Sequence, residues 1–162
     1  MAMQPITVGA LLALQLLHVL FLALHDWIPL GSLNDVKAVR AENPVHKLFV
    51  GMLISTIPFV IGFAASCIYL GGMYPGWLRW WLWISYALLF LGELEAWWIP
   101  YFFGAKPERV ARYEAMFGST HAFLPARNGI RPNTLHVILH AATAAILIVL
   151  GVLTAQQWWP NS

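Results

Sequence analysis

Seven ionisable side chains lie inside stretches of the chain that are otherwise apolar. They are His18, His25, Asp26, Glu93, Glu95, His136 and His140. A charged side chain at the centre of a bilayer costs about 2.5–3.5 kcal/mol on insertion scales, so residues of this kind are rare there and mark a partner or a function. Any chemistry that this chain performs is therefore sought first among these seven residues.

Two pairs of histidines share helix faces, a spacing that can serve metal binding. His136 and His140 are four residues apart, and His18 and His25 are seven apart. Imidazoles on one helix, completed from a neighbouring helix, can bind zinc or iron. The sequence predicts His25, His136 and His140 as ligands, with Glu93 as a general base. A single haem held between His18 and His140 is a further alternative.

The two glutamates of the third apolar stretch cannot both face the same site. Tyr86, Glu93 and Trp97 share one helix face, whereas Glu95 is rotated by about 200° from Glu93. We therefore expect Glu93 in the interior. Glu95 is expected to reach the lipid headgroups or a second subunit.

Acid–base chemistry without a metal explains the same residues. A buried glutamate and a histidine can pass protons to and from a lipophilic molecule. In this version Glu93 is the proton donor and His140 its partner, with Asp26 and His18 as further catalytic candidates. The remaining alternative is a structural network in which these groups only hydrogen-bond across helices.

The elements that must position these residues are four apolar helices. The chain has 162 residues, of which 60% are hydrophobic and only 10% charged, against about 25% charged in a soluble domain. Crossing a hydrocarbon core takes about 20 helical residues. Four stretches qualify: Ile6–Leu30, Leu48–Leu70, Arg79–Phe103 and Thr134–Trp158. We predict one all-α domain, an integral membrane bundle of four transmembrane helices.

The distribution of positive charge predicts how the bundle is oriented. Arg79 is the one Lys or Arg residue outside the first and third connections. The others lie within these connections: Lys37, Arg40, Lys47, Lys106, Arg109, Arg112, Arg127 and Arg131. Under the positive-inside rule these connections are cytoplasmic, and both termini lie outside the cell membrane. At 1.5 Å per residue, the ionisable residues then fall between mid-membrane and the cytoplasmic face.

The third connection combines a helix with possible headgroup ligands. The segment Pro107–Phe117 has the pattern of a short amphipathic helix, with proline in its first turn. Arg127, Arg131 and His121 follow it and can hold a phosphate or carboxylate group. We predict these three residues, together with Trp97 and Tyr86, as substrate-binding; topology enforcement and lipid contact are the alternative role for the arginines.

Other features limit the class of partner. Gly51 and Ser55, and likewise Gly62 and Ser66, place small residues four apart, which permits close helix packing and formation of a homo-oligomer. The net charge of +2 does not indicate nucleic acid, and the single cysteine, Cys67, excludes an internal disulfide. No phosphate-binding glycine loop or dinucleotide fingerprint occurs.

The sequence predicts a small membrane-embedded enzyme that acts on a lipophilic or lipid-like molecule, with zinc, iron or no cofactor. One alternative is a proton- or cation-coupled transporter that uses the same residues. Another is a non-catalytic, haem-binding or haem-free subunit of a larger membrane complex.

Overall fold

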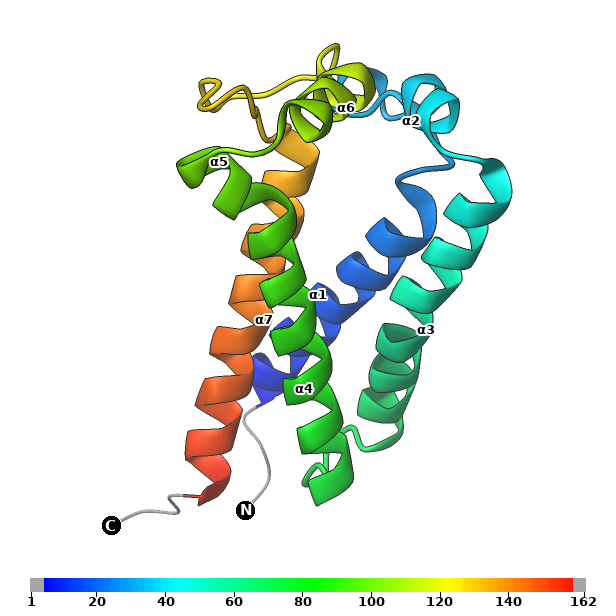
Figure 1. Cartoon of the computed structure of the whole chain (residues 1–162). Helices are drawn as coiled ribbons and strands as arrows, with labels where there is room; N and C mark the ends of the chain where they lie inside the picture. The colour runs from blue at the N-terminus through cyan, green and yellow to red at the C-terminus, as the bar shows by residue number, and fades with distance from the viewer. Residues whose placement is uncertain (1–4, 159–162) are drawn as a thin grey trace.

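Four long helices form a ring in the computed structural model, which describes residues 5–158. They are α1 (Pro5–Leu24), α3 (Val45–Ile68), α4 (Gly76–Glu93) and α7 (Thr134–Trp158). A π-helical turn, η2 (Leu94–Trp98), and α5 (Ile99–Phe103) extend α4. Helix α1 packs against α3 and α7, and α4 packs against the same two helices, as Figure 1 shows.

The four long helices are long and apolar enough to cross a membrane. The qualifying segments are Ile6–Leu24, Val45–Ile68, Gly76–Phe103 and Thr134–Gln156. Large apolar side chains such as Ile54, Leu88 and Ile148 project outward, each more than half exposed. An apolar outer surface suits lipid contact, so the architecture fits a multi-pass membrane protein. The predicted all-helical class is confirmed for residues 5–158, which contain no strand beyond one isolated bridge.

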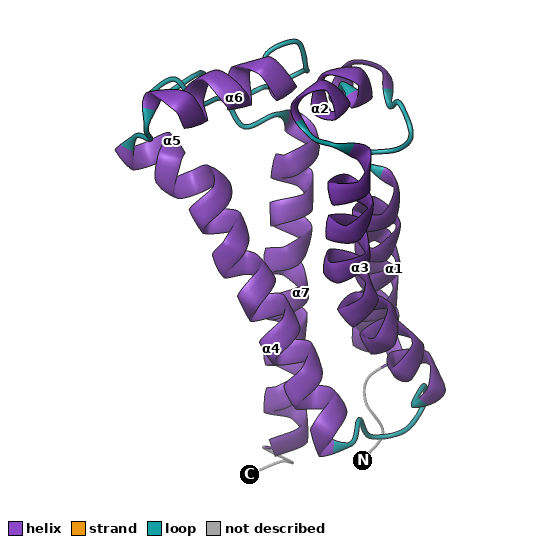
Figure 2. Ribbon diagram, turned by 45° about the vertical axis from the view of Figure 1, so that its right-hand side comes forward, coloured by secondary structure: helices purple, strands orange, loops and turns teal. Residues whose placement is uncertain are grey.

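The two ends of the ring differ in their connections. At one end, here called the turn end, residues 69–75 join α3 to α4. At the other, here called the cap end, two short helices, α2 (Val36–Glu42) and α6 (Pro107–Phe117), pack against each other across the long helices (Figure 2). A short 3-10 turn, η1 (Gly31–Leu33), precedes α2. The predicted helix Pro107–Phe117 is confirmed, whereas α2 was not expected.

The first long helix ends at Leu24, earlier than the predicted end at Leu30. The side chain of Asn34 provides the physical reason, because it binds the backbone of the segment that follows. Its amide donates to the carbonyl oxygens of His25 (2.6 Å) and Ile28 (2.9 Å), and its oxygen accepts from the Leu30 N–H (2.6 Å). Residues 25–30 thus form a turn rather than another helical turn and a half.

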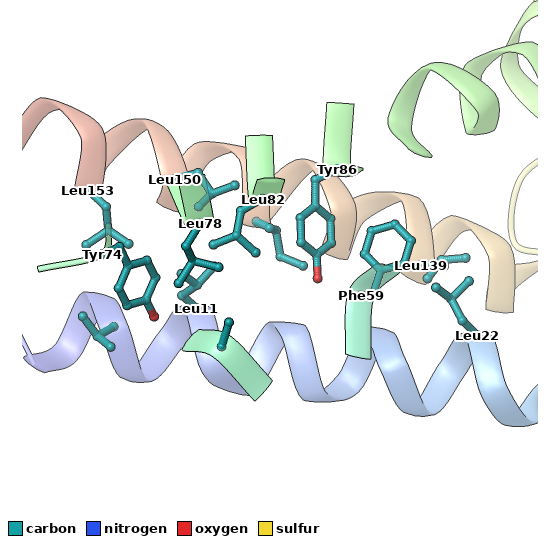
Figure 3. Close-up of a cluster of buried hydrophobic side chains, with 13 residues drawn as sticks. Leu11, Leu22, Phe59, Tyr74, Leu78, Leu82, Tyr86, Leu139, Leu150 and Leu153 are labelled. Atoms are coloured by element: carbon teal, nitrogen blue, oxygen red, sulfur yellow. The ribbon is translucent and has the colours of Figure 1, made fainter. Parts of the chain in front are cut away.

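Leucine and aromatic side chains fill the turn-end half of the ring. Leu11, Leu78, Leu82, Ile146 and Leu150 are at most 4% exposed and meet in the middle of the bundle. Figure 3 shows Leu11, Leu78, Leu82 and Leu150 between α1 and α7, with Tyr86 and Phe59 beside them toward the cap end. This half of the ring is a continuous apolar core.

Candidate active site in the polar core

A set of polar side chains lies at the centre of the ring, next to the apolar core. We call it the polar core. Its members are buried, and each long helix supplies at least one of them: Gln15 and His18 from α1, Thr56 from α3, Tyr86 and Glu93 from α4, and His140 and Thr143 from α7. Gln15 and His18 continue the buried stripe of α1 that begins with Val8 and Leu11, so helical periodicity alone directs them inward.

Glu93 is held by only one of its two carboxyl oxygens. The Thr143 hydroxyl donates to Glu93 Oε1 at 2.7 Å, and the same hydroxyl lies 3.1 Å from the Leu139 carbonyl oxygen. Glu93 Oε2 is buried and has no hydrogen-bond partner among the described residues. A carboxyl group with one fixed oxygen and one unused oxygen is well oriented to give or take a proton.

Several other polar atoms in this core also lack partners within residues 5–158. They are both side-chain polar atoms of Gln15, both ring nitrogens of His18, and the hydroxyl oxygens of Thr56 and Tyr86. An unpaired buried polar group costs about 1–3 kcal/mol. The His18 ring instead contacts the rings of Tyr86 and Phe59, with centroids 5.5 and 5.6 Å apart. Buried polar atoms without partners are uncommon in folded proteins, so this cluster is the candidate for a functional site.

A hydrogen bond determines the protonation form of His140. The indole N–H of Trp98, which can only donate, lies 3.0 Å from His140 Nδ1. His140 Nδ1 is therefore an acceptor, and the ring is the neutral tautomer that carries its proton on Nε2. His140 lies one helical turn before Thr143, the residue that binds Glu93. The tryptophan thus presents a neutral imidazole to the region of the carboxyl group.

A π-helical turn follows Glu93 and ends at Trp98, the residue that binds His140. The Ile99 N–H bonds to the Leu94 carbonyl, five residues back, and Pro100 has no N–H to offer to Ala96. The carbonyl oxygens of Glu95 and Ala96 are consequently available to other donors. Helix α6 supplies these donors, and π-helical turns are frequent at functional sites.

Two side chains of α6 bind the carbonyl groups freed by the π-helical turn. The Arg109 guanidinium lies 3.2 Å from the Glu95 oxygen and 3.3 Å from the Ala96 oxygen, and the Tyr113 hydroxyl lies 2.5 Å from the Ala96 oxygen. Sequence reasoning missed this arrangement. Pro100 was the available signal, because it leaves the carbonyl of residue 96 without its α-helical donor.

The structure brings the three histidines predicted as metal ligands side by side, with the His136 ring centroid 6.0 Å from that of His25 and 6.2 Å from that of His140. His25 Nδ1 lies 2.9 Å from the Phe21 carbonyl oxygen and His136 Nδ1 lies 2.6 Å from Asn133 Oδ1, while Trp98 occupies His140 Nδ1. Within the part of the chain that the structure describes, no three His, Cys, Asp or Glu side chains gather closely enough to hold a metal ion. The predicted ligand set of His25, His136 and His140 therefore finds no support.

His136 and Asp26 lie nearer the cap end than the polar core. The His136 ring packs against Trp97 and Phe117, with centroids 4.6 and 5.2 Å apart, and is only partly buried. Asp26 follows the end of α1, where its carboxylate lies 3.3 Å from His25 Nε2, and both side chains are partly exposed. Asp26 is thus separate from Glu93, although both were predicted as catalytic.

The predicted headgroup ligands lie at the cap end but each makes its own contact. His121 Nδ1 lies 2.7 Å from Thr134 Oγ1, Arg131 donates to the Gly118 carbonyl at 3.2 Å, and the Arg127 guanidinium lies over the Phe102 ring at 5.2 Å. All three are exposed. Of the residues predicted as substrate-binding, Tyr86 is the one that lies in the polar core. Trp97 lies at the cap end, where its ring packs against Tyr113 and Phe117 of α6.

The chain was compared with protein-family models, with curated proteins and with solved structures, and no match was found. Its functional interpretation therefore depends on its own side chains.

Proposed function

We propose that this protein is a small membrane-embedded enzyme that performs acid–base chemistry on a lipophilic molecule in the polar core. The observation that carries the proposal is Glu93, a buried carboxyl group with one oxygen held by Thr143 and the other without a partner among the described residues. Gln15, His18 and Tyr86 of the same polar core also carry polar groups without partners among the described residues. Buried neutral donors and acceptors of this kind suit a substrate that brings its own polar atom.

Each residue has a defined part in this proposal. Glu93 Oε2 gives a proton to the substrate or takes one from it, while Thr143 fixes the carboxyl plane. His140, neutral and protonated on Nε2 because Trp98 occupies Nδ1, is the partner that donates a hydrogen bond from Nε2–H to the polar atom of the substrate. Trp98 is a positioning residue, since it acts through His140.

The apolar core favours an enzyme over a transporter. A proton or cation path needs polar access from both ends of the bundle. On the turn-end side of the polar core, the interior is filled with side chains that cannot hydrogen-bond: Leu11, Leu78, Leu82 and Leu150, which Figure 3 shows, and Ile146. A route through the ring would have to cross this layer.

The proposal is tested by comparing lipids in the organism's own membranes. Strains that carry the wild-type gene, Glu93→Gln or Glu95→Gln are extracted, and total lipophilic compounds are compared by mass spectrometry. Glu95 is a matched control, because it is a carboxylate two residues away that is exposed rather than buried. We expect one lipophilic compound to accumulate in the Glu93→Gln strain alone. Identical lipid profiles in all three strains would refute the proposal.

A further inference from the structure

We propose that the substrate is an uncharged lipophile with a hydrocarbon tail and an oxygen-bearing head, and that it enters the polar core sideways from the lipid, between α3 and α4 and past Phe59. This inference rests on the proposed function and adds its substrate class and its route of entry. It follows from a groove on the outer surface and from what lies directly behind it.

The groove runs between α3 and α4 and has a volume of about 750 Å³. Its lining is almost entirely apolar, with two serines as the only hydroxyl-bearing residues: Ile54, Ser55, Pro58 and Phe59 from α3, and Trp77, Trp80, Trp81, Ile84, Ser85, Leu88 and Leu89 from α4. No charged side chain lines it. A groove of this composition facing lipid accepts a hydrocarbon chain rather than a polar one.

The sequence of α3 explains where the two helices meet and where they separate. A Cβ atom on Gly62 would lie 2.9 Å from Leu82 Cδ2, so the glycine allows close contact toward the turn end. One turn earlier in α3, the Trp81 indole donates to the Pro58 carbonyl at 2.9 Å. Beyond these contacts α3 and α4 diverge toward the cap end in both Figure 1 and Figure 2.

Phe59 forms the wall between the groove and the polar core. It lines the groove, yet it is only 6% exposed because its ring packs inward. Its centroid lies 4.9 Å from that of Tyr86 and 5.6 Å from that of His18. Figure 3 shows Phe59 and Tyr86 side by side at the centre of the bundle. Rotation of this one side chain connects the groove with the polar core.

The groups behind Phe59 define the head of the substrate. Gln15 and His18 are fully buried, Tyr86 is 1% exposed, and the amide, imidazole and phenol groups of these residues have no hydrogen-bond partners within residues 5–158. These are neutral donors and acceptors, suited to a carbonyl, hydroxyl or ester oxygen. Among the described residues no Lys or Arg is buried with them, so a phosphate or carboxylate head would enter without a counter-charge.

The test is photo-crosslinking of the purified protein in phosphatidylcholine nanodiscs. The probe is a sixteen-carbon alcohol with a diazirine close to the hydroxyl group, and the matched probe is the corresponding alkyl phosphate. We expect the alcohol to label residues of the groove and polar core, chiefly Phe59, Ser85 and Tyr86, at least tenfold above the alkyl phosphate. Even labelling over all lipid-facing helices, or equal labelling by the phosphate, would overturn the inference.

Variants separate the route from the chemistry. Ser85→Trp fills the groove and should reduce labelling of Tyr86 at least tenfold, whereas Ile138→Trp, on an exposed position of α7, should leave it unchanged. Leu88→Trp serves as a second obstruction if Ser85→Trp does not fold. Glu93→Gln should retain labelling, because the route does not use its proton. If the labelling pattern is not observed but lipid conversion still depends on Glu93, the route is refuted and the proposed function stands.

Discussion

The hydroxyl group of Tyr113 is predicted to hold the π-helical turn that places Trp98 against His140. Tyr113→Phe removes that hydroxyl and keeps the ring, which packs against Trp97 with centroids 4.8 Å apart. The Ala96 oxygen then loses its 2.5 Å bond and retains the Arg109 contact at 3.3 Å. Since Pro100 has no N–H, the backbone cannot replace the missing donor.

The stability lost in Tyr113→Phe can be worked out from the energies of single hydrogen bonds. Loss of one bond contributes about 0.5–1.5 kcal/mol, and a carbonyl left without any donor about 1–3 kcal/mol. We therefore expect Tyr113→Phe to lower the free energy of unfolding by about 1 kcal/mol. Combining it with Arg109→Met should cost more than the sum of the single changes, because the two side chains share the Ala96 oxygen.

The assay is reversible unfolding in mixed detergent micelles, together with hydrogen exchange of the amides of residues 94–103. Exchange in this segment should accelerate in Tyr113→Phe. Tyr69→Phe is the matched control, because Tyr69 lies at the turn end and is 36% exposed. Unchanged stability and unchanged exchange in Tyr113→Phe would show that α6 does not hold the π-helical turn, and the positioning role assigned to it would be wrong.

Three further predictions concern contacts elsewhere in the bundle. Thr143→Val should lower the free energy of unfolding by about 0.6–1.7 kcal/mol, the range of interhelical hydrogen bonds in membrane proteins, and a double-mutant cycle with Glu93→Gln should show that the effect depends on Glu93. Gly62→Val should cost about 1–3 kcal/mol through overpacking, whereas Gly92→Val, where a Cβ atom meets nothing within 4 Å, should cost less. At the cap end, hydrogen bonds from the Ala38 N–H and the Ser119 hydroxyl lower the pKa of Asp35. A lowered pKa means that its stabilising effect is present above the ordinary value of about 3.9 and is lost as the pH falls through the lower folded value, so the difference in thermal stability between wild type and Asp35→Asn should vanish in acid.

Helix type and helix location were predictable from the sequence because they depend on apolar length. Hydrophobic runs identified the four long helices, and the proline followed by an amphipathic pattern identified Pro107–Phe117. The end of α1 was predicted six residues late, because the ending depends on Asn34, a side chain that binds backward to His25 and Leu30. Such local hydrogen bonds do not alter hydropathy, so an apolar run conceals them.

The candidate site was predictable only in part. The sequence predicted one inward-facing site of His18, His25, Asp26, Glu93, His136 and His140. The structure buries His18, Glu93 and His140, whereas His25, Asp26 and His136 are partly exposed. The spacing of His136 and His140 also suited a metal ion, but spacing does not reveal that Asn133 and Trp98 already bind their Nδ1 atoms. Trp98 comes from another helix, so its contact with His140 becomes visible only when the helices are packed, whereas Asn133 lies three residues before His136.

The most direct test of the central claim is the rate at which purified protein in nanodiscs converts the lipophilic compound that accumulates in the Glu93→Gln strain. Loss of a general acid or base typically slows a reaction by about 10²–10⁴-fold. We predict that Glu93→Gln lowers the rate of conversion by a factor in this range. Glu95→Gln should convert the compound within about twofold of the wild-type rate, because the exposed Glu95 carboxylate takes no part in the proton transfer. If Glu93→Gln converted the compound at the wild-type rate, Glu93 could not be the proton donor, and the proposed function would be wrong.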